Sequence, residues 1–298
     1  MERKTLFIIN PISGGKKKDG VPELIGKYFG NGEANTSIVF SDGVNHARLI
    51  AKEAVGKFDL IVAVGGDGTV NEVASALSKT NTTLGIIPYG SGNGLARFLS
   101  IPMDTEKAIT LLLTGPTETI DSGTLNGMPF FNMAGMGFDA HISKVFSGGK
   151  TRGFFNYIRM SFIEFKKYNS QNYSIYIDGV EYERKVFMLS FANSSQYGNN
   201  AHISPNASVQ DGLLDVCFIQ KFPFWRLPEM GMRMLFKAAE GTKYVNVIRG
   251  KHISVKREIP GPVHIDGEPQ VTGQDAEIDV VPHSIKVVVG TDFKVLRR

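Results

Sequence analysis

Short apolar runs alternate with segments of helical periodicity from the N-terminus to about Thr119. The runs are rich in β-branched and aliphatic residues and end in turn-forming residues, which is typical of strands. The predicted strands are Thr5–Asn10, Thr36–Phe40, Leu60–Val64 and Thr83–Ile87. The predicted helices are Val21–Phe29, His46–Val55, Val70–Leu77 and a segment that begins at Leu95. Strands that alternate with helices predict an α/β domain with a doubly wound parallel sheet.

Beyond Thr119 the predicted strands follow one another with Asn-Gly, Asp-Gly or Pro between them, which favours a mostly antiparallel, β-rich second domain. These strands are Thr119–Leu125, Met128–Met133, Tyr173–Ile177, Val186–Ala192, Leu214–Ile219, Lys251–Val255, Val263–Ile265, Glu277–Val281 and Ile285–Val289. Two predicted helices, Phe154–Tyr168 and Trp225–Ala239, interrupt them. We therefore predict domains at residues 1–120 and 121–284, with the segment 285–298 able to pack back on the first.

The composition is that of a globular protein with a real core, because 42% of the 298 residues are hydrophobic and 21% are charged. The single cysteine, Cys217, excludes an internal disulfide framework and lies in an apolar stretch. A net charge of +4 suits anionic partners, but no nucleic-acid-binding motif accompanies it. Without about 18 consecutive apolar residues anywhere, we expect a cytoplasmic protein whose membrane contact is peripheral.

Three glycine-rich turns follow predicted strands of the first domain: Asn10–Gly15, Gly65–Thr69 and Gly90–Asn93. Glycine lets consecutive backbone N–H groups point inward, and helix N-termini favour anions, so such turns can hold phosphate. Ser13, Thr69 and Ser91 add hydroxyl donors, and Lys16–Lys18 add positive charge. One such turn would be a plain connection, but three at equivalent strand ends favour a phosphate site.

Asp67 lies within the second turn, where phosphate would repel its carboxylate unless a cation came between them. Mg²⁺ resolves this conflict, whereas the alternative is a residue that caps a helix or stabilises a turn. Neither a Walker A pattern nor a dinucleotide-binding fingerprint follows any strand, which disfavours P-loop enzymes and Rossmann dehydrogenases.

Taken together, the motifs resemble the diacylglycerol kinase catalytic-domain family, which includes bacterial lipid kinases, sphingosine kinases and ceramide kinases. The resemblance is carried, in order, by Asn10–Gly14, Gly65–Glu72, Pro88–Arg97, Asp211–Asp215 and Ile265–Pro269. It covers nearly the whole chain. The Gly-Gly-Asp-Gly-Thr motif alone is less specific, because NAD kinases and phosphofructokinases carry similar sequences.

This resemblance implies a first domain like that of NAD kinases and phosphofructokinases, ATP and Mg²⁺ as cofactors, and a nucleotide cleft between the two domains. The implied ATP contacts are Asn10, Pro11, Ser13, Gly14, Ser41, Gly65, Gly66, Asp67, Gly68, Thr69, Asn71, Glu72, Gly90, Ser91, Gly92 and Asn93. It also implies catalytic roles for Asp67, Asp266 and Glu268. Either Asp266 or Glu268 would accept the proton of the lipid hydroxyl, and the pair could help to hold Mg²⁺. By itself Asp266–Pro269 would be a hairpin turn.

A separate structural Mg²⁺ site is implied at Ser208, Asp211 and Leu213, where the alternative is an ordinary loop. Asp121 resembles a member of the family's acidic network, where it would orient water or metal. One position departs from the bacterial pattern, because Gly94 stands where an acidic residue is common. The Gly-Ser-Gly-Asn form is closer to sphingosine kinases.

The lipid must come from a membrane. Aromatic and basic residues in Phe222–Phe236, and in Lys150–Phe155 with the following Met160–Phe165, offer amphipathic surface or core packing. Two other functions stay open: an NAD kinase-like enzyme acting on a soluble substrate, and a non-catalytic regulator that binds nucleotide or lipid. The sequence leaves open which lipid is used and whether the chain forms a homodimer.

Overall fold

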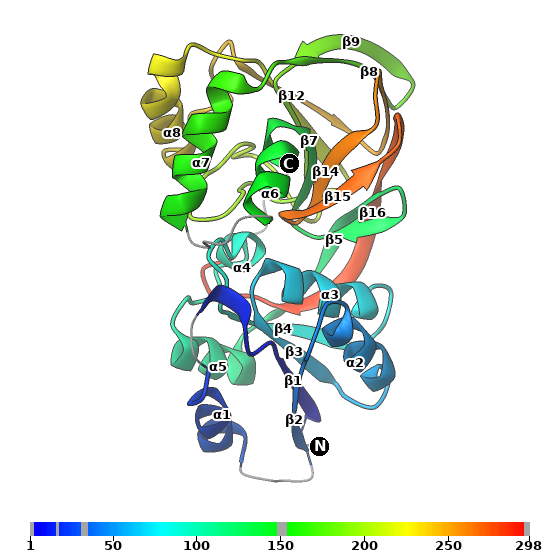
Figure 1. The fold of residues 1–298 in the computed structure, drawn as a ribbon. Coiled ribbons are helices and arrows are strands. Elements are labelled where there is room, and N and C mark those ends of the chain that lie inside the picture. The colour runs from blue at the N-terminus through cyan, green and yellow to red at the C-terminus, as the bar shows by residue number, and fades with distance from the viewer. Residues whose placement is uncertain (1–2, 16–17, 31–34, 148–153, 295–298) are drawn as a thin grey trace. The chain divides into compact units, whose positions relative to one another are not determined.

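The computed structural model describes residues 3–15, 18–30, 35–147 and 154–294, and it divides into two compact units (Figure 1). The first unit contains the chain up to Ile120 together with His283–Lys294, and the second contains Asp121–Pro282. Two strands, β5 (Thr117–Leu125) and β16 (Asp275–Val288), contribute residues to both units. No helix among the described residues is long and apolar enough to cross a membrane.

A parallel sheet forms the centre of the first unit. Its strands are β2 (Thr36–Phe40), β1 (Thr5–Ile9), β3 (Leu60–Gly65) and β4 (Thr83–Pro88), in that spatial order. The end of β16 continues the sheet beside β4, with Lys286 opposite Thr83. All residues of β1, β3 and β4 are buried, as continuous apolar runs require when helices cover both faces of a sheet.

Two pairs of helices cover this sheet, one on each side, as Figure 1 shows. They are α1 (Val21–Phe29) with α5 (Thr105–Thr114), and α2 (His46–Ala54) with α3 (Asp67–Leu77). The short α4 (Gly94–Phe98) follows the third glycine-rich turn. The parallel α/β architecture predicted from the sequence is confirmed. Helix α5 was not predicted, although Asp104 caps it by accepting a hydrogen bond from the Lys107 N–H (2.9 Å).

The second unit is a sandwich of two largely antiparallel sheets, which confirms the β-rich prediction. One sheet has the strands β12 (Val245–Gly250), β11 (Leu214–Ile219), β10 (Met188–Ala192), β7 (Met133–Gly137), β14 (Gly261–Ile265) and β15 (Glu268–Thr272), in that spatial order. Opposite lie β8 (Gln171–Ile177), β9 (Val180–Val186), β13 (His252–Arg257) and the start of β16, together with the hairpin of β5 and β6 (Met128–Phe130). Both sheets bury side chains in one core that includes Phe130, Phe191 and Ile278.

Helices α6 (Phe138–Ser147), α7 (Phe154–Lys167) and α8 (Leu227–Leu235) complete this unit. Four details differ from the sequence prediction. The expected strand Met128–Met133 is two strands, whereas the expected strands Glu277–Val281 and Ile285–Val289 are one, β16. Helix α8 ends before Ala239, and α6, β9, β12 and β15 were not predicted as separate elements. In β9 and β15 most side chains are exposed and polar, so these strands lack the apolar runs on which the prediction depended.

Candidate active site

The three glycine-rich turns of the first unit pack directly against one another. A Cβ atom on Gly14 would lie 1.7 Å from the carbonyl oxygen of Tyr89, and one on Gly90 would lie 2.8 Å from Cα of Gly66. Gly14 also has a φ of 67°, a left-handed conformation that glycine adopts without strain. Larger residues would therefore force the turns apart. Gly14 is therefore required by its conformation and by close backbone approach, and Gly90 by close approach alone.

Polar side chains join the same turns. Asn10 Nδ2 donates to Thr69 Oγ1 (3.0 Å), which ties the first turn to the second. Asp67 begins α3, and its carboxylate accepts hydrogen bonds from the backbone N–H groups of Asn93 and Gly94, each at 2.9 Å. The Asp67 carboxylate therefore links the second turn to the third and satisfies the first N–H groups of α4.

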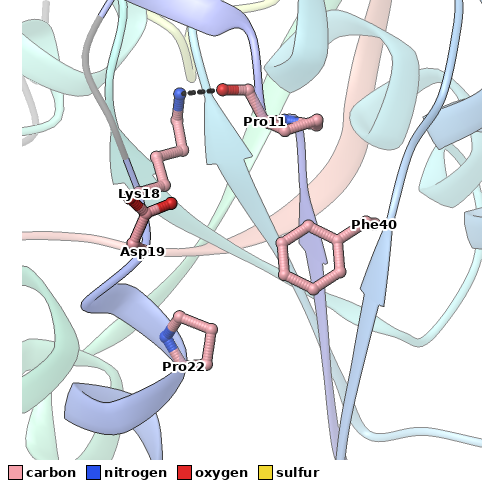
Figure 2. A pocket seen from close by; sticks show the side chains of 5 residues that line it. All are labelled: Pro11, Lys18, Asp19, Pro22 and Phe40. Carbon is pink, nitrogen blue, oxygen red and sulfur yellow. Dashed lines mark hydrogen bonds between the residues drawn. The ribbon is translucent and has the colours of Figure 1, made fainter.

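A buried lysine supports the first turn. Lys18 Nζ donates to the carbonyl oxygens of Ser13 (2.7 Å) and Pro11 (3.4 Å), and it lies 5.0 Å from the centre of the Tyr89 ring. Burial lowers the pKa of the Lys18 ammonium group. Beside it lies a pocket of about 420 Å³, drawn in Figure 2 and lined by Pro11, Lys18, Asp19, Pro22 and Phe40. Lys16 and Lys17 lie outside the described residues.

The other predicted nucleotide contacts have varied surroundings. Ser41 is buried directly after β2, and Ser91 is exposed. The Glu72 carboxylate accepts the N–H groups of Asn45 (2.9 Å) and Ala47 (3.1 Å) at the start of α2. This side chain therefore stabilises a helix terminus. Gly65, Gly68, Asn71 and Gly92 lie within the second and third turns or on α3.

In the second unit, Asp266 and Gly267 form the two-residue hairpin between β14 and β15. Their φ values of 48° and 87° are both positive, as a tight Asp-Gly hairpin turn requires. The buried Asp266 carboxylate accepts three backbone N–H groups, from Phe131 (3.0 Å), Asn132 (2.9 Å) and Met133 (3.0 Å). Glu268 is exposed and opens β15. The two carboxylates of this hairpin thus differ in kind: Asp266 is fixed inside the fold and Glu268 faces solvent.

Asp121 is fully buried and belongs to the same polar network. Its Oδ2 accepts the N–H of Gly212 (2.8 Å), and its carbonyl oxygen accepts a hydrogen bond from Asn193 Nδ2 (2.9 Å). Asn193 Nδ2 also donates to the carbonyl oxygen of Phe131 (2.7 Å). Asn193 therefore connects Asp121 with Phe131, which is one of the residues that bind the Asp266 carboxylate. Asn193 was not among the residues predicted from the sequence.

The loop Ser208–Leu213 contacts Asp121 through the N–H of Gly212. The Asp211 carboxylate accepts the N–H of Leu213 (3.2 Å), and Ser208 Oγ accepts the N–H of Gln210 (3.4 Å). Within the described ranges, no three histidine, cysteine, aspartate or glutamate side chains form a metal-ligating group. Any metal at this loop would therefore need backbone carbonyl oxygens besides the Asp211 carboxylate.

A buried histidine supports the Asp-Gly hairpin, although the sequence analysis gave it no role. His264 Nε2 lies 3.0 Å from Asp139 Oδ2, and the N–H of Gly267 donates to His264 Nδ1 (3.4 Å). Ser190 Oγ donates to the same Asp139 oxygen (3.0 Å). Because 125 positions separate Asp139 from His264, no local pattern could have revealed this pair.

The chain thus combines an α/β unit that has converging glycine-rich turns with a β sandwich that carries an Asp-Gly-Glu hairpin. Residues 4–125 match the family model described as diacylglycerol kinase catalytic domain. Residues 132–289 match the model described as YegS C-terminal NAD kinase beta sandwich-like domain. The chain therefore belongs to the family of diacylglycerol kinases and YegS-like lipid kinases, which confirms the resemblance seen in the sequence.

Individual relatives agree with this assignment. A diacylglycerol kinase of Mycobacterium tuberculosis is 30% identical over 96% of this chain and 94% of its own. One from Bacillus subtilis is 32% identical over 78% of this chain and 79% of its own. The structure is similar to that of a Bacillus anthracis diacylglycerol kinase, with a TM-score of 0.77, 22% identity and 98% coverage of both chains. An NAD kinase from Archaeoglobus fulgidus in complex with ATP gives a TM-score of 0.54 at 14% identity, covering 97% of this chain and 95% of its own. These two structures show likeness of fold alone.

Proposed function

We propose that the protein transfers the γ-phosphoryl group of ATP to a hydroxyl group of a membrane lipid, either diacylglycerol or a related lipid such as a sphingoid base. The observation that carries this proposal is the convergence of three glycine-rich turns around Asp67 in a chain of the lipid kinase family. Phosphoryl transfer depends mainly on positioning the phosphate groups and neutralising their charge. The backbone N–H groups of such turns can do both.

The ATP phosphates would lie against the backbone N–H groups of the three turns. Lys18 would add positive charge at the first turn, where its ammonium group already contacts two carbonyl oxygens. The pocket in Figure 2 suits the base or ribose, because Phe40 offers an aromatic side chain that is 49% exposed. The predicted contact Ser41 directly follows Phe40.

Mg²⁺ fits these residues as an ion that arrives with the nucleotide. Kinases usually bind Mg²⁺ through one or two carboxylates and the phosphate oxygens, so a preformed cage of several side chains is not required. Asp67 would supply such a carboxylate, and the bound ion would neutralise phosphate charge. A second, structural ion would use Asp211 with the carbonyl oxygens of Ser208 and Leu213, while Asp121 would hold the adjoining loop.

We assign the general base to Glu268. A base must be free to approach the hydroxyl proton of the substrate, and Glu268 is exposed at the start of β15. The Asp266 carboxylate is instead held by three N–H groups, which suits a residue that positions the hairpin. His264 and Asp139 would support the same turn from the interior of the sandwich.

An assay of purified protein with ATP and Mg²⁺ tests this function. The acceptors would be diacylglycerol, monoacylglycerol, sphingosine, dihydrosphingosine and ceramide in mixed micelles, with NAD as the soluble acceptor. We expect phosphate on one lipid class and none on NAD. Phosphorylation of NAD alone would favour the NAD kinase-like alternative. Nucleotide binding without any product would favour a non-catalytic regulator.

A further inference from the structure

Helix α8 carries apolar side chains on two opposite faces. Met230 and Met234 on the inner face belong to a core cluster of the second unit or pack against it. On the outer face, Met232, Leu235 and Phe236 have the spacing i, i+3, i+4, so they share one side of the helix. They are 53%, 48% and 72% exposed. An ordinary surface helix has a polar outer face, so this face departs from the usual amphipathic pattern.

Further exposed apolar side chains lie on the elements next to α8. Trp225, in the short 3-10 helix that precedes α8, is 78% exposed. Phe162 and Ile163 of the neighbouring α7 are 40% and 42% exposed. The rings of Phe162 and Phe224 are in contact, with centres 6.0 Å apart, so α7 lies beside the 3-10 helix that precedes α8. We call these six residues the outer α8 face: Phe162, Ile163, Trp225, Met232, Leu235 and Phe236.

Four basic side chains lie on the same elements as this face. Lys166 Nζ lies 4.2 Å above the Phe224 ring, and Lys237 is exposed next to Phe236. Arg226 and Arg233 share a single carboxylate, that of Glu229, at 3.7 and 2.9 Å. The rim therefore has more positive than negative charge, which complements an anionic surface.

We propose that the outer α8 face docks on an anionic lipid bilayer, an inference that rests on the proposed lipid kinase function. An apolar face with a basic rim is the composition of helices that lie in the membrane interface. Basic side chains are attracted to anionic lipids, and tryptophan is favoured at the boundary between headgroups and acyl chains. Contact with a bilayer would bring the second unit to its water-insoluble substrate. Segment 150–153, which the sequence analysis also proposed for docking, lies outside the described residues.

The chain contains one tryptophan, Trp225, so its fluorescence reports on this face alone. The probe would be vesicles of phosphatidylcholine with or without phosphatidylglycerol, each also prepared with a brominated acyl chain. We expect phosphatidylglycerol vesicles to shift the emission to shorter wavelength, and the brominated ones to quench it. Vesicles of phosphatidylcholine alone should shift and quench the emission only weakly. Sedimentation with vesicles while the emission stays unchanged would overturn the proposal, as would the absence of binding.

Two variants sharpen the test. Phe236→Ser should weaken vesicle binding about tenfold, because it removes one large apolar side chain from the interface. Ile259→Ser is the matched control, since Ile259 is 65% exposed on another part of the second unit. Equal binding by both variants would refute the assignment of this face.

A short-chain diacylglycerol below its micelle concentration separates this proposal from the proposed function. Its phosphorylation without vesicle binding would refute only the docking face. Vesicle binding without phosphorylation of any lipid would refute only the kinase function.

Discussion

The different surroundings of Asp266 and Glu268 predict opposite effects of removing each negative charge. In Asp266→Asn, one oxygen can still accept the N–H groups of Asn132 and Met133, but the new amide NH₂ faces the N–H of Phe131. The loss of one charge-assisted hydrogen bond and the weakening of two others should cost about 3 kcal/mol of unfolding free energy. For a unit of this size that corresponds to a melting temperature lower by about 6–12 °C.

Glu268→Gln should leave stability within about 0.5 kcal/mol of the wild type, because the side chain is exposed. If Glu268 is the base, kcat should fall by about 10²–10⁴-fold. Thermal unfolding and steady-state kinetics on the same preparations would measure both effects. Asp275→Asn, at another exposed carboxylate of this unit, is the matched control and should change neither quantity.

The opposite pattern would refute this reasoning. A fully active Glu268→Gln enzyme, together with an inactive Asp266→Asn enzyme of unchanged melting temperature, would make Asp266 the base. This result would also show that the three hydrogen bonds of the Asp266 carboxylate contribute little to stability.

Three further predictions concern the packing and the titration of single residues. Gly90→Ala should raise the KM for ATP and cost about 1–3 kcal/mol of stability, because the new methyl group overlaps the neighbouring turn. Gly43→Ala, whose Cβ would have nothing within 4 Å, should change neither, and an equal effect would contradict the packing argument. Burial lowers the pKa of His202, so the native state disfavours its protonation, and the stability should fall as the pH drops below about 6.5. Between pH 7.5 and 5, the melting temperature should fall less for His202→Gln than for the wild type. An equal fall in both proteins would exclude His202 as the cause of the pH dependence. Burial raises the pKa of the Cys217 thiol, so a thiol-specific reagent should label it only after unfolding, and rapid labelling of the native protein would contradict its burial.

The sequence by itself determined the architecture of the first unit and the class of protein. Apolar runs such as Leu60–Val64 identify buried parallel strands, since residues covered on both faces need no alternation. The glycine-rich turns could be recognised from composition alone, because a left-handed conformation such as that of Gly14, or a close backbone approach such as that of Gly90 to Gly66, excludes larger residues. The Asp266-Gly267 hairpin was equally readable, because its turn type demands this residue pair. In each case the signal lies within a few neighbouring residues.

Only the tertiary structure decided what the polar side chains contact. The Glu72 carboxylate accepts hydrogen bonds at the start of α2, and the Asp67 carboxylate accepts them from the third turn. The Asp266 carboxylate accepts them from Phe131–Met133. The tertiary structure also pairs His264 with Asp139 on α6, a helix that the sequence analysis missed. A buried polar group must find a partner wherever packing places one, often far away in the chain. Local periodicity determines which residues form a strand or a helix, but it carries no information about that partner.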